Sequence, residues 1–297
     1  MMVKMHEHEL FIDEVIVKRL IDTQCPQWKH LPIQRIASSG TDNALFRLGL
    51  DYIVRLPRLD GGTPNINKEC EWLPKLAPML KTPISAPVHK GLPSDTYPYF
   101  WTIARWHEGN VPNFELNDDY EYLAIDLADF INEFHAIKLP EGPISRRGVA
   151  LNTTALDAET RQAIKQLYAD INVERVTALW DQLSQIPYWD NDLVWIHGDL
   201  LPGNILTQQN RLSAVIDFSD VGLGDPASDL IPAWCLFNSR SRAVFKCHLK
   251  AVDENTWQRG RGRALSMALI ILPYYKNTNP VLADIARTMI CQILDDA

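Results

Sequence analysis

The sequence lacks the features that would indicate a membrane-spanning, secreted or nucleic-acid-binding protein. The apolar stretch at residues 264–273 is too short to span a bilayer and stops at a proline. The five cysteines form no CxxC pair, so we expect reduced thiols in a cytoplasmic protein. Residues 1–11 are too polar and acidic for a signal peptide. The net charge of −8 disfavours a nucleic-acid partner, because a phosphate backbone binds to basic surfaces.

The sequence does contain two regions of different hydrophobic pattern. Short strand patterns separated by turn residues fill the first hundred residues, and helical periodicity prevails from about residue 117. This predicts an α+β fold with a small β-rich N-lobe, residues 1–104, and a larger, mainly helical C-lobe, residues 105–297. The expected elements are strands at 33–37, 43–48, 52–56, 85–90 and 99–105, helices at 9–22, 65–80, 156–169 and 172–185, and helix breaks near Asn238, Asp253 and Pro273–Pro280.

Residues 194–220, VWIHGDLLPGNILTQQNRLSAVIDFSD, place polar side chains at the ends of two strand-like runs. A strand, a loop and a hairpin would bring Asp199, Asn204 and Asp217 to one place. Two carboxylates and an amide oxygen are hard ligands that suit Mg²⁺. If Asn204 and Asp217 bind the metal, Asp199 is left to accept a proton from a substrate hydroxyl, and His197 orients the loop. A base, an Asn and a metal-binding Asp are the parts used for phosphoryl transfer.

Purely structural roles compete with this interpretation for several polar residues. Asp199 alone would suit a helix N-cap. Asp225 is expected to cap the helix that begins near residue 226, and Asp229 either caps that helix or pairs with the loop that contains Asp199. Arg146 and Arg147 are expected to be a solvated pair in a loop.

The stretch HGDLLPGNIL, followed by VIDF and GDPASDL, resembles the aminoglycoside phosphotransferase family. The segment SSGTDNALFRLG resembles that family's phosphate-covering loop, YIVRLPR its third strand, and NKECEWL its N-lobe helix. ALIILPYYKNTNP is similar to C-terminal segments of the members nearer to macrolide kinases. The resemblance implies a bilobal, protein-kinase-like fold that transfers the γ-phosphoryl group of ATP or GTP, with Mg²⁺, to a hydroxyl of a small molecule.

The resemblance also implies a role for individual residues. Asp199 would be the catalytic base, Asn204 and Asp217 would bind Mg²⁺, and Arg55 would stand where many kinases have lysine. Ser219 replaces the glycine of the Asp-Phe-Gly motif, and Gly40 is the only glycine of the phosphate loop. The nucleotide, bound between the lobes, would contact Ser39, Gly40, Thr41, Arg55 with its ion-pair partner Glu69, and the hinge residues Ala104 and Trp106.

The identity of the acceptor stays open at this stage. An aminoglycoside, a macrolide, an amino-sugar metabolite and a housekeeping alcohol are all compatible with the motifs. The acidic residues Asp118, Asp119 and Glu121 would suit a cationic acceptor. Two competing classes are a nucleotide-binding module without turnover and a metal-dependent hydrolase. The latter is disfavoured because the chain lacks a dense His/Asp cluster.

Overall fold

The computed structural model describes residues 9–36, 43–112, 120–139 and 141–296. The predicted phosphate-loop residues Ser39, Gly40 and Thr41, and the acidic residues Asp118 and Asp119, lie outside these described ranges. The chain divides into two compact units. Unit 1 contains Met1–Gly109 and Ser213–Ser219, and unit 2 contains Asn110–Leu212 and Asp220–Ala297.

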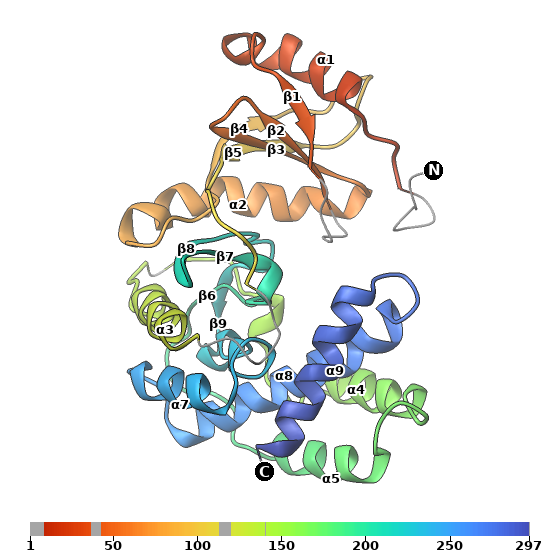
Figure 1. The fold of residues 1–297 in the computed structure, drawn as a ribbon, viewed down its shortest axis with the longest axis vertical. Helices are drawn as coiled ribbons and strands as arrows, with labels where there is room; N and C mark the ends of the chain where they lie inside the picture. The colour runs from red at the N-terminus through yellow and green to blue at the C-terminus, as the bar shows by residue number, and fades with distance from the viewer. Residues whose placement is uncertain (1–8, 37–42, 113–119, 140, 297) are drawn as a thin grey trace. The chain divides into compact units, whose positions relative to one another are not determined.

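Unit 1 is built on a five-stranded antiparallel sheet with the strand order β1-β2-β3-β5-β4. Helix α1 lies on one face of this sheet and α2 lies on the other (Figure 1). The elements are α1 (Glu14–Gln24), β1 (Ile33–Arg35), β2 (Asn43–Leu48), β3 (Tyr52–Pro57), α2 (Thr63–Leu76), β4 (Pro87–Gly91) and β5 (Trp101–Arg105), with 3-10 turns at Pro26–Trp28, Asp60–Gly62 and Ala77–Met79.

The alternation of side chains along β3 explains how the sheet separates its two helices. Val54 and Leu56 belong to the apolar core that also contains Val17 and Leu20 of α1. Arg55 points to the opposite face, because successive strand residues alternate between the faces of a sheet. There it contacts a residue of α2, so the sheet carries an apolar core on one side and a buried charge on the other.

Unit 2 is mainly helical and contains two short two-stranded sheets, β6 with β9 and β7 with β8. The last residues of β8, Ser213–Val215, belong to unit 1. The elements are α3 (Glu121–His135), α4 (Thr154–Gln166), α5 (Val173–Ser184), β6 (Val194–Ile196), β7 (Ile205–Gln208), β8 (Arg211–Val215), β9 (Gly222–Gly224), α6 (Pro232–Cys235), α7 (Ser239–His248), α8 (Glu254–Tyr275) and α9 (Pro280–Asp295), with 3-10 turns at Arg146–Gly148, Pro202–Asn204 and Pro226–Asp229.

Helix α8 is the central helix of unit 2, because it packs against α4, α5, α9 and the turn at Pro226–Asp229. Its buried residues lie on every side of the helix and include three arginines, Arg259, Arg261 and Arg263. Among the described residues, no helix is long and apolar enough to cross a membrane.

The predicted elements are found with shifted ends. Residues 33–35, 43–48, 52–57, 87–91 and 101–105 are strands, and the helix expected at 9–22 begins after its N-cap Asp13. Asn238 and Asp253 are N-caps of α7 and α8, as their predicted breaks imply. The break expected within Pro273–Pro280 is confirmed, because α8 ends at Tyr275 and α9 begins at Pro280, although Pro273 itself lies inside α8. A proline near a helix C-terminus removes one hydrogen bond and leaves the preceding turns intact.

Candidate active site

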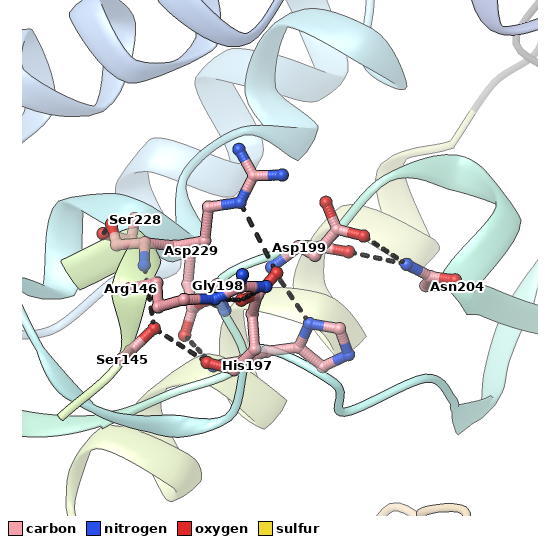
Figure 2. Close-up of polar contacts among 10 residues, drawn as sticks. Ser145, Arg146, His197, Gly198, Asp199, Asn204, Ser228 and Asp229 are labelled. Atoms are coloured by element: carbon pink, nitrogen blue, oxygen red, sulfur yellow. Dashed lines mark hydrogen bonds and ion pairs between the residues drawn. The ribbon is translucent and has the colours of Figure 1, made fainter. Parts of the chain in front are cut away.

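One buried carboxylate, that of Asp229, accepts hydrogen bonds from the loop after β6. Asp229 exposes 0% of its surface, and its Oδ1 accepts a hydrogen bond from Gly198 N at 2.8 Å. Its Oδ2 accepts from His197 N at 3.1 Å and lies 3.0 Å from His135 Nε2. Of the two alternatives that the sequence left open for Asp229, the structure therefore shows pairing with the loop (Figure 2).

Gly198 turns the loop in a conformation that favours glycine. Its φ of +81° lies in the left-handed region, and a Cβ added there would stand 3.1 Å from Cβ of Arg147. The chain can thus turn sharply between the buried His197 and the partly exposed Asp199. The backbone N–H of Asp199 donates to Nδ1 of His197 at 3.2 Å, so this ring nitrogen is an acceptor. The role of His197 in orienting the loop stays a prediction.

Asn204 orients the carboxylate of Asp199. Its Nδ2 donates to the backbone oxygen of Asp199 at 2.8 Å and to Oδ2 of Asp199 at 3.0 Å (Figure 2). Both bonds use the amide nitrogen, so the amide oxygen of Asn204 takes no part in them. A short turn holds this arrangement, because Asn204 N donates to the carbonyl of Leu201.

The donor set of this loop fits Mg²⁺ better than a metal that needs several protein ligands. In the part of the chain that the structure describes, no group of three or more His, Cys, Asp or Glu residues is arranged to hold a metal ion. The uncommitted amide oxygen of Asn204 is a hard ligand, and Mg²⁺ binds through few protein groups together with water and substrate phosphates. A cation here would therefore depend on a phosphate-bearing substrate.

In unit 1, Arg55 lies between two carboxylates. Its Nη1 donates to Oε2 of Glu69 at 2.6 Å, and its Nη2 donates to Oδ1 of Asp217 at 3.2 Å. Burial lowers the pKa of Arg55, but the charges of Glu69 and Asp217 outweigh this effect and raise the pKa overall. Burial raises the pKa of Glu69, while the charge of Arg55 acts in the opposite direction. We take the pair to be ionised, because the guanidinium stays charged and lies within hydrogen-bond distance.

Asp217 has a backbone conformation that is uncommon outside glycine. Its φ is +59°, and its N–H donates to Oγ of Ser85 at 3.3 Å. A left-handed aspartate costs of the order of 1 kcal/mol, and such residues are concentrated at functional sites. Asp217 follows the end of β8 by two residues, and in this conformation its carboxylate contacts Arg55.

The two predicted hinge residues differ in what their backbones offer. Ala104 is buried in β5 and pairs with Ile53 in the sheet. The N–H of Trp106 donates to the carbonyl of Asp51 at 2.8 Å, so this N–H is already paired. The guanidinium of Arg47 lies 3.7 Å from the Trp106 ring centroid, which fixes this indole.

Arg146 and Arg147 are exposed to solvent, as predicted, and they also have a partner that was not predicted. Both contact the buried carboxylate of Asp220, at 3.1 Å from Arg146 Nη2 and at 3.5 Å from Arg147 Nε. Local sequence contained no signal for this contact, because the partners are more than seventy residues apart. Asp225 does cap the turn at Pro226–Asp229, and it also forms a buried ion pair with Arg259 at 2.8 Å.

The chain belongs to the Phosphotransferase enzyme family (APH), whose sequence pattern matches residues 33–263. This confirms the family that the motifs predicted. "Uncharacterized protein YcbJ" of Bacillus subtilis (strain 168) is 25% identical over 130 residues. That match covers 39% of this chain and 39% of the relative, so the chain spans about two fifths of the length of the curated protein that it matches.

Two solved structures show the fold. The GDP complex of wild-type aminoglycoside 2'-phosphotransferase-IIIa is 18% identical, with a TM-score of 0.71 over 96% of this chain and 99% of that chain. The macrolide 2'-phosphotransferase MphH from Brachybacterium faecium, as apoenzyme, is 18% identical, with a TM-score of 0.61 over 94% of this chain and 98% of that chain. The predicted kinase-like fold class is confirmed by these similarities.

Proposed function

We propose that this chain transfers the γ-phosphoryl group of a nucleoside triphosphate to a hydroxyl of a small molecule, with Mg²⁺ as cofactor. Family membership supports a small-molecule phosphotransferase. The observation that carries the proposal is the geometry of the catalytic loop, in which Asn204 holds the Asp199 carboxylate at 3.0 Å and keeps its own amide oxygen available. GDP in a related structure supports a nucleotide co-substrate.

In the proposed reaction, Asp199 accepts the proton of the acceptor hydroxyl as the new bond forms. The hydroxyl oxygen bonds to the γ-phosphorus, the bond between this phosphorus and its bridging oxygen breaks, and the nucleoside diphosphate leaves. Most of the acceleration would come from positioning and from neutralising charge. Mg²⁺, bound by Asn204 and Asp217, would supply positive charge to the phosphate oxygens.

The two predicted lobes have different roles in this proposal. The N-lobe, residues 1–104, would bind the nucleotide through Arg55 and Glu69, with the hinge residues Ala104 and Trp106 near its base. Arginine stays charged and can bind phosphate through two parallel hydrogen bonds. The C-lobe, residues 105–297, would supply the catalytic loop and bind the acceptor. The phosphate-loop roles of Ser39, Gly40 and Thr41 remain part of the proposal.

Replacing Asp199 tests the proposal directly. Asp199→Ala should lower kcat by about 10²–10⁴-fold, the range for loss of a general base. Thermal stabilisation by Mg²⁺ and nucleotide should persist in this variant. The assay measures nucleoside diphosphate release from ATP and from GTP with a panel of hydroxyl compounds. Asp190→Asn, which changes an exposed carboxylate before β6, serves as the matched control and should keep its full rate.

The same assay separates the proposal from its main alternative. A nucleotide-binding module without turnover would be stabilised by Mg²⁺ and nucleotide but would release no diphosphate with any acceptor. Full turnover by Asp199→Ala with a wild-type substrate would show that another group is the base. Aminoglycosides and macrolides belong in the panel because related structures carry these names. Amino sugars and other metabolic alcohols test a housekeeping role.

A further inference from the structure

Unit 2 contains a cavity of about 280 Å³ that borders the catalytic loop. Gly198, the residue directly before Asp199, forms part of its lining. The rest of the lining comes from the turn at Arg146–Gly148, from α4, from the turn at Pro226–Asp229 and from α8. The size suits a small metabolite or one end of a larger molecule.

Arg263 of α8 lines this cavity and lacks the partners that a buried guanidinium needs. It exposes 8% of its surface, and its Nε and Nη2 atoms are buried without a hydrogen-bond partner among the described residues. A buried donor without an acceptor is costly, and a buried charge without a counter-charge costs more. Burial lowers the pKa of Arg263 to about 10, so the side chain is still cationic at neutral pH.

The neighbouring arginines of α8 have more partners than Arg263, although Nε of Arg261 is also buried without a hydrogen-bond partner among the described residues. Arg259 forms a two-point contact with Asp225, at 2.8 and 3.3 Å. Arg261 donates Nη2 to the backbone oxygen of Ile293 at 2.6 Å. The chain thus satisfies its other buried guanidinium groups on α8 at least in part, and Arg263 is directed at a cavity instead of a carboxylate.

The charges of the cavity lining favour an anion. Arg146, Arg147 and Arg263 contribute three positive charges, and Glu159 contributes one negative charge. Asp220 lies behind the first two arginines and offsets one more charge. The balance of these five groups is one net positive charge. The carboxylate of Asp225 also acts on Arg263, but it is already paired with Arg259.

We infer that this cavity binds a carboxylate or phosphate group of the acceptor, with Arg263 as its principal ligand. The inference rests on the proposed phosphotransferase function and narrows its substrate class to hydroxyl compounds that carry a negative charge. The planar guanidinium of arginine can donate two parallel hydrogen bonds to two oxygens of a carboxylate or of a phosphate. Leu156, Ile231, Met267 and Ile270 form an apolar side of the same cavity, which suits the carbon skeleton of such a compound.

This inference gives the acceptor the opposite charge to the cationic acceptor that the sequence suggested. Of the acidic residues that motivated that expectation, Glu121 is the one within the described ranges, and it forms an ion pair with Arg240. A polycation in the cavity would be repelled by Arg263 and would leave its donors unsatisfied. The site therefore discriminates by charge as well as by shape.

The first experiment compares the stability of two variants without ligand. Arg263→Met removes an unpartnered charge and should leave the melting temperature unchanged or raise it. Arg261→Met is the matched control, because it makes the same substitution two residues away and removes a formed hydrogen bond, so it should lower the melting temperature. A loss in Arg263→Met equal to that in Arg261→Met would mean that Arg263 serves the fold, and the assignment would be wrong.

The second experiment measures anion binding by calorimetry without nucleotide and at constant ionic strength. The probes are inorganic phosphate and gluconate, with glucose as the neutral control. Wild type and Arg261→Met should bind at least one anion, and the phosphate and carboxylate arms identify which anion the cavity prefers. In Arg263→Met the dissociation constant should rise by about 10- to 100-fold, as for a lost hydrogen bond to a charged group. Arg263→Gln provides the same test if the methionine variant fails to fold.

The outcomes for the cavity and for the proposed function can be told apart. Anion binding that depends on Arg263, without phosphate transfer to any acceptor, would retain the site and refute the enzyme. Turnover of neutral or cationic acceptors, with anion binding equal in wild type and Arg263→Met, would retain the enzyme and refute the site. If both hold, gluconate or a related hydroxy acid should be phosphorylated faster than its neutral counterpart, and Arg263→Met should abolish that preference.

Discussion

Asp229 contacts the loop after β6, and its replacement by asparagine removes one negative charge there while the side chain keeps its shape. In the wild type, the carboxylate of Asp229 accepts hydrogen bonds from the N–H groups of His197 and Gly198 and also contacts His135. Asparagine offers a single acceptor oxygen. If that oxygen keeps Gly198, the amide NH₂ faces the N–H of His197, and two donors meet.

The cost follows from these contacts. One buried backbone N–H left without an acceptor costs about 1–3 kcal/mol. The contact with His135 can survive, because the amide can donate to the ring nitrogen in the other tautomer. The bond to Gly198 persists but loses its ionic strengthening. We therefore expect Asp229→Asn to lower the free energy of unfolding by about 2–4 kcal/mol, and Asp229→Ala by about 3–5 kcal/mol, as for removal of a buried charged partner.

Urea unfolding measures the stability change, and diphosphate release measures its effect on the loop. Asp225→Asn is the control, because it also removes a buried carboxylate but leaves the bonds to His197 and Gly198 unchanged. Under conditions where both variants are folded, kcat should fall by about 10–100-fold in Asp229→Asn, since small misplacements of catalytic groups are costly, and much less in the control. If Asp229→Asn had the same free energy of unfolding as the wild type, the hydrogen bonds from His197 and Gly198 to Asp229 would be refuted. Equal rates in the two variants would refute the positioning role.

Three further predictions concern other parts of the chain. Arg55→Met leaves Glu69, which is 2% exposed, without its counter-charge; urea unfolding should show a loss of about 3–5 kcal/mol that Arg55→Met/Glu69→Met largely restores, and equal losses in the two variants would contradict the ion pair. Gly91→Ala places a Cβ 1.9 Å from Cε2 of Trp101, so unfolding followed by tryptophan fluorescence should show a loss of about 1–3 kcal/mol, and unchanged stability would contradict this packing. The hydrogen bonds from Thr256 lower the pKa of Asp253, so its contribution to stability is present above its ordinary pKa and is lost as the pH falls through the lowered value. The stability difference between wild type and Asp253→Asn should therefore disappear between about pH 5 and pH 2, and a difference that persists at low pH would show that ionisation is not its source.

Local patterns were sufficient to predict the strands of unit 1 and the helix breaks near Asn238 and Asp253, which are the N-caps of α7 and α8. An N-cap such as Asp253 bonds to a backbone N–H three residues away, so the evidence for it lies within a short stretch of sequence. Strand-like runs between turn residues likewise located β2 and β3, of which only β2 alternates in burial. The break predicted within Pro273–Pro280 was found at residues 276–279, where Pro280 begins the next helix.

Contacts between distant segments were beyond the reach of these patterns. Asp220 meets Arg146 across 74 positions, and Asp229 meets His135 across 94. Motif spacing could propose that Asp199 and Asn204 act together, since they share one loop. It could not show that the amide nitrogen, and not the oxygen, faces the carboxylate. That choice depends on the turn that closes the loop.

The proposed preference of the cavity for an anion illustrates the same limit in energetic terms. A net charge of −8 spread over 297 residues indicates a cationic ligand only if the ligand meets the average surface. A ligand in the cavity instead meets the few charges that line it, and burial strengthens its interaction with Arg263 because little water screens that side chain. Arg263 combines a positive charge, burial and unsatisfied donors at one position of that lining. One such side chain outweighs many exposed carboxylates elsewhere, since charges separated by more than about 8 Å of salt solution are largely screened.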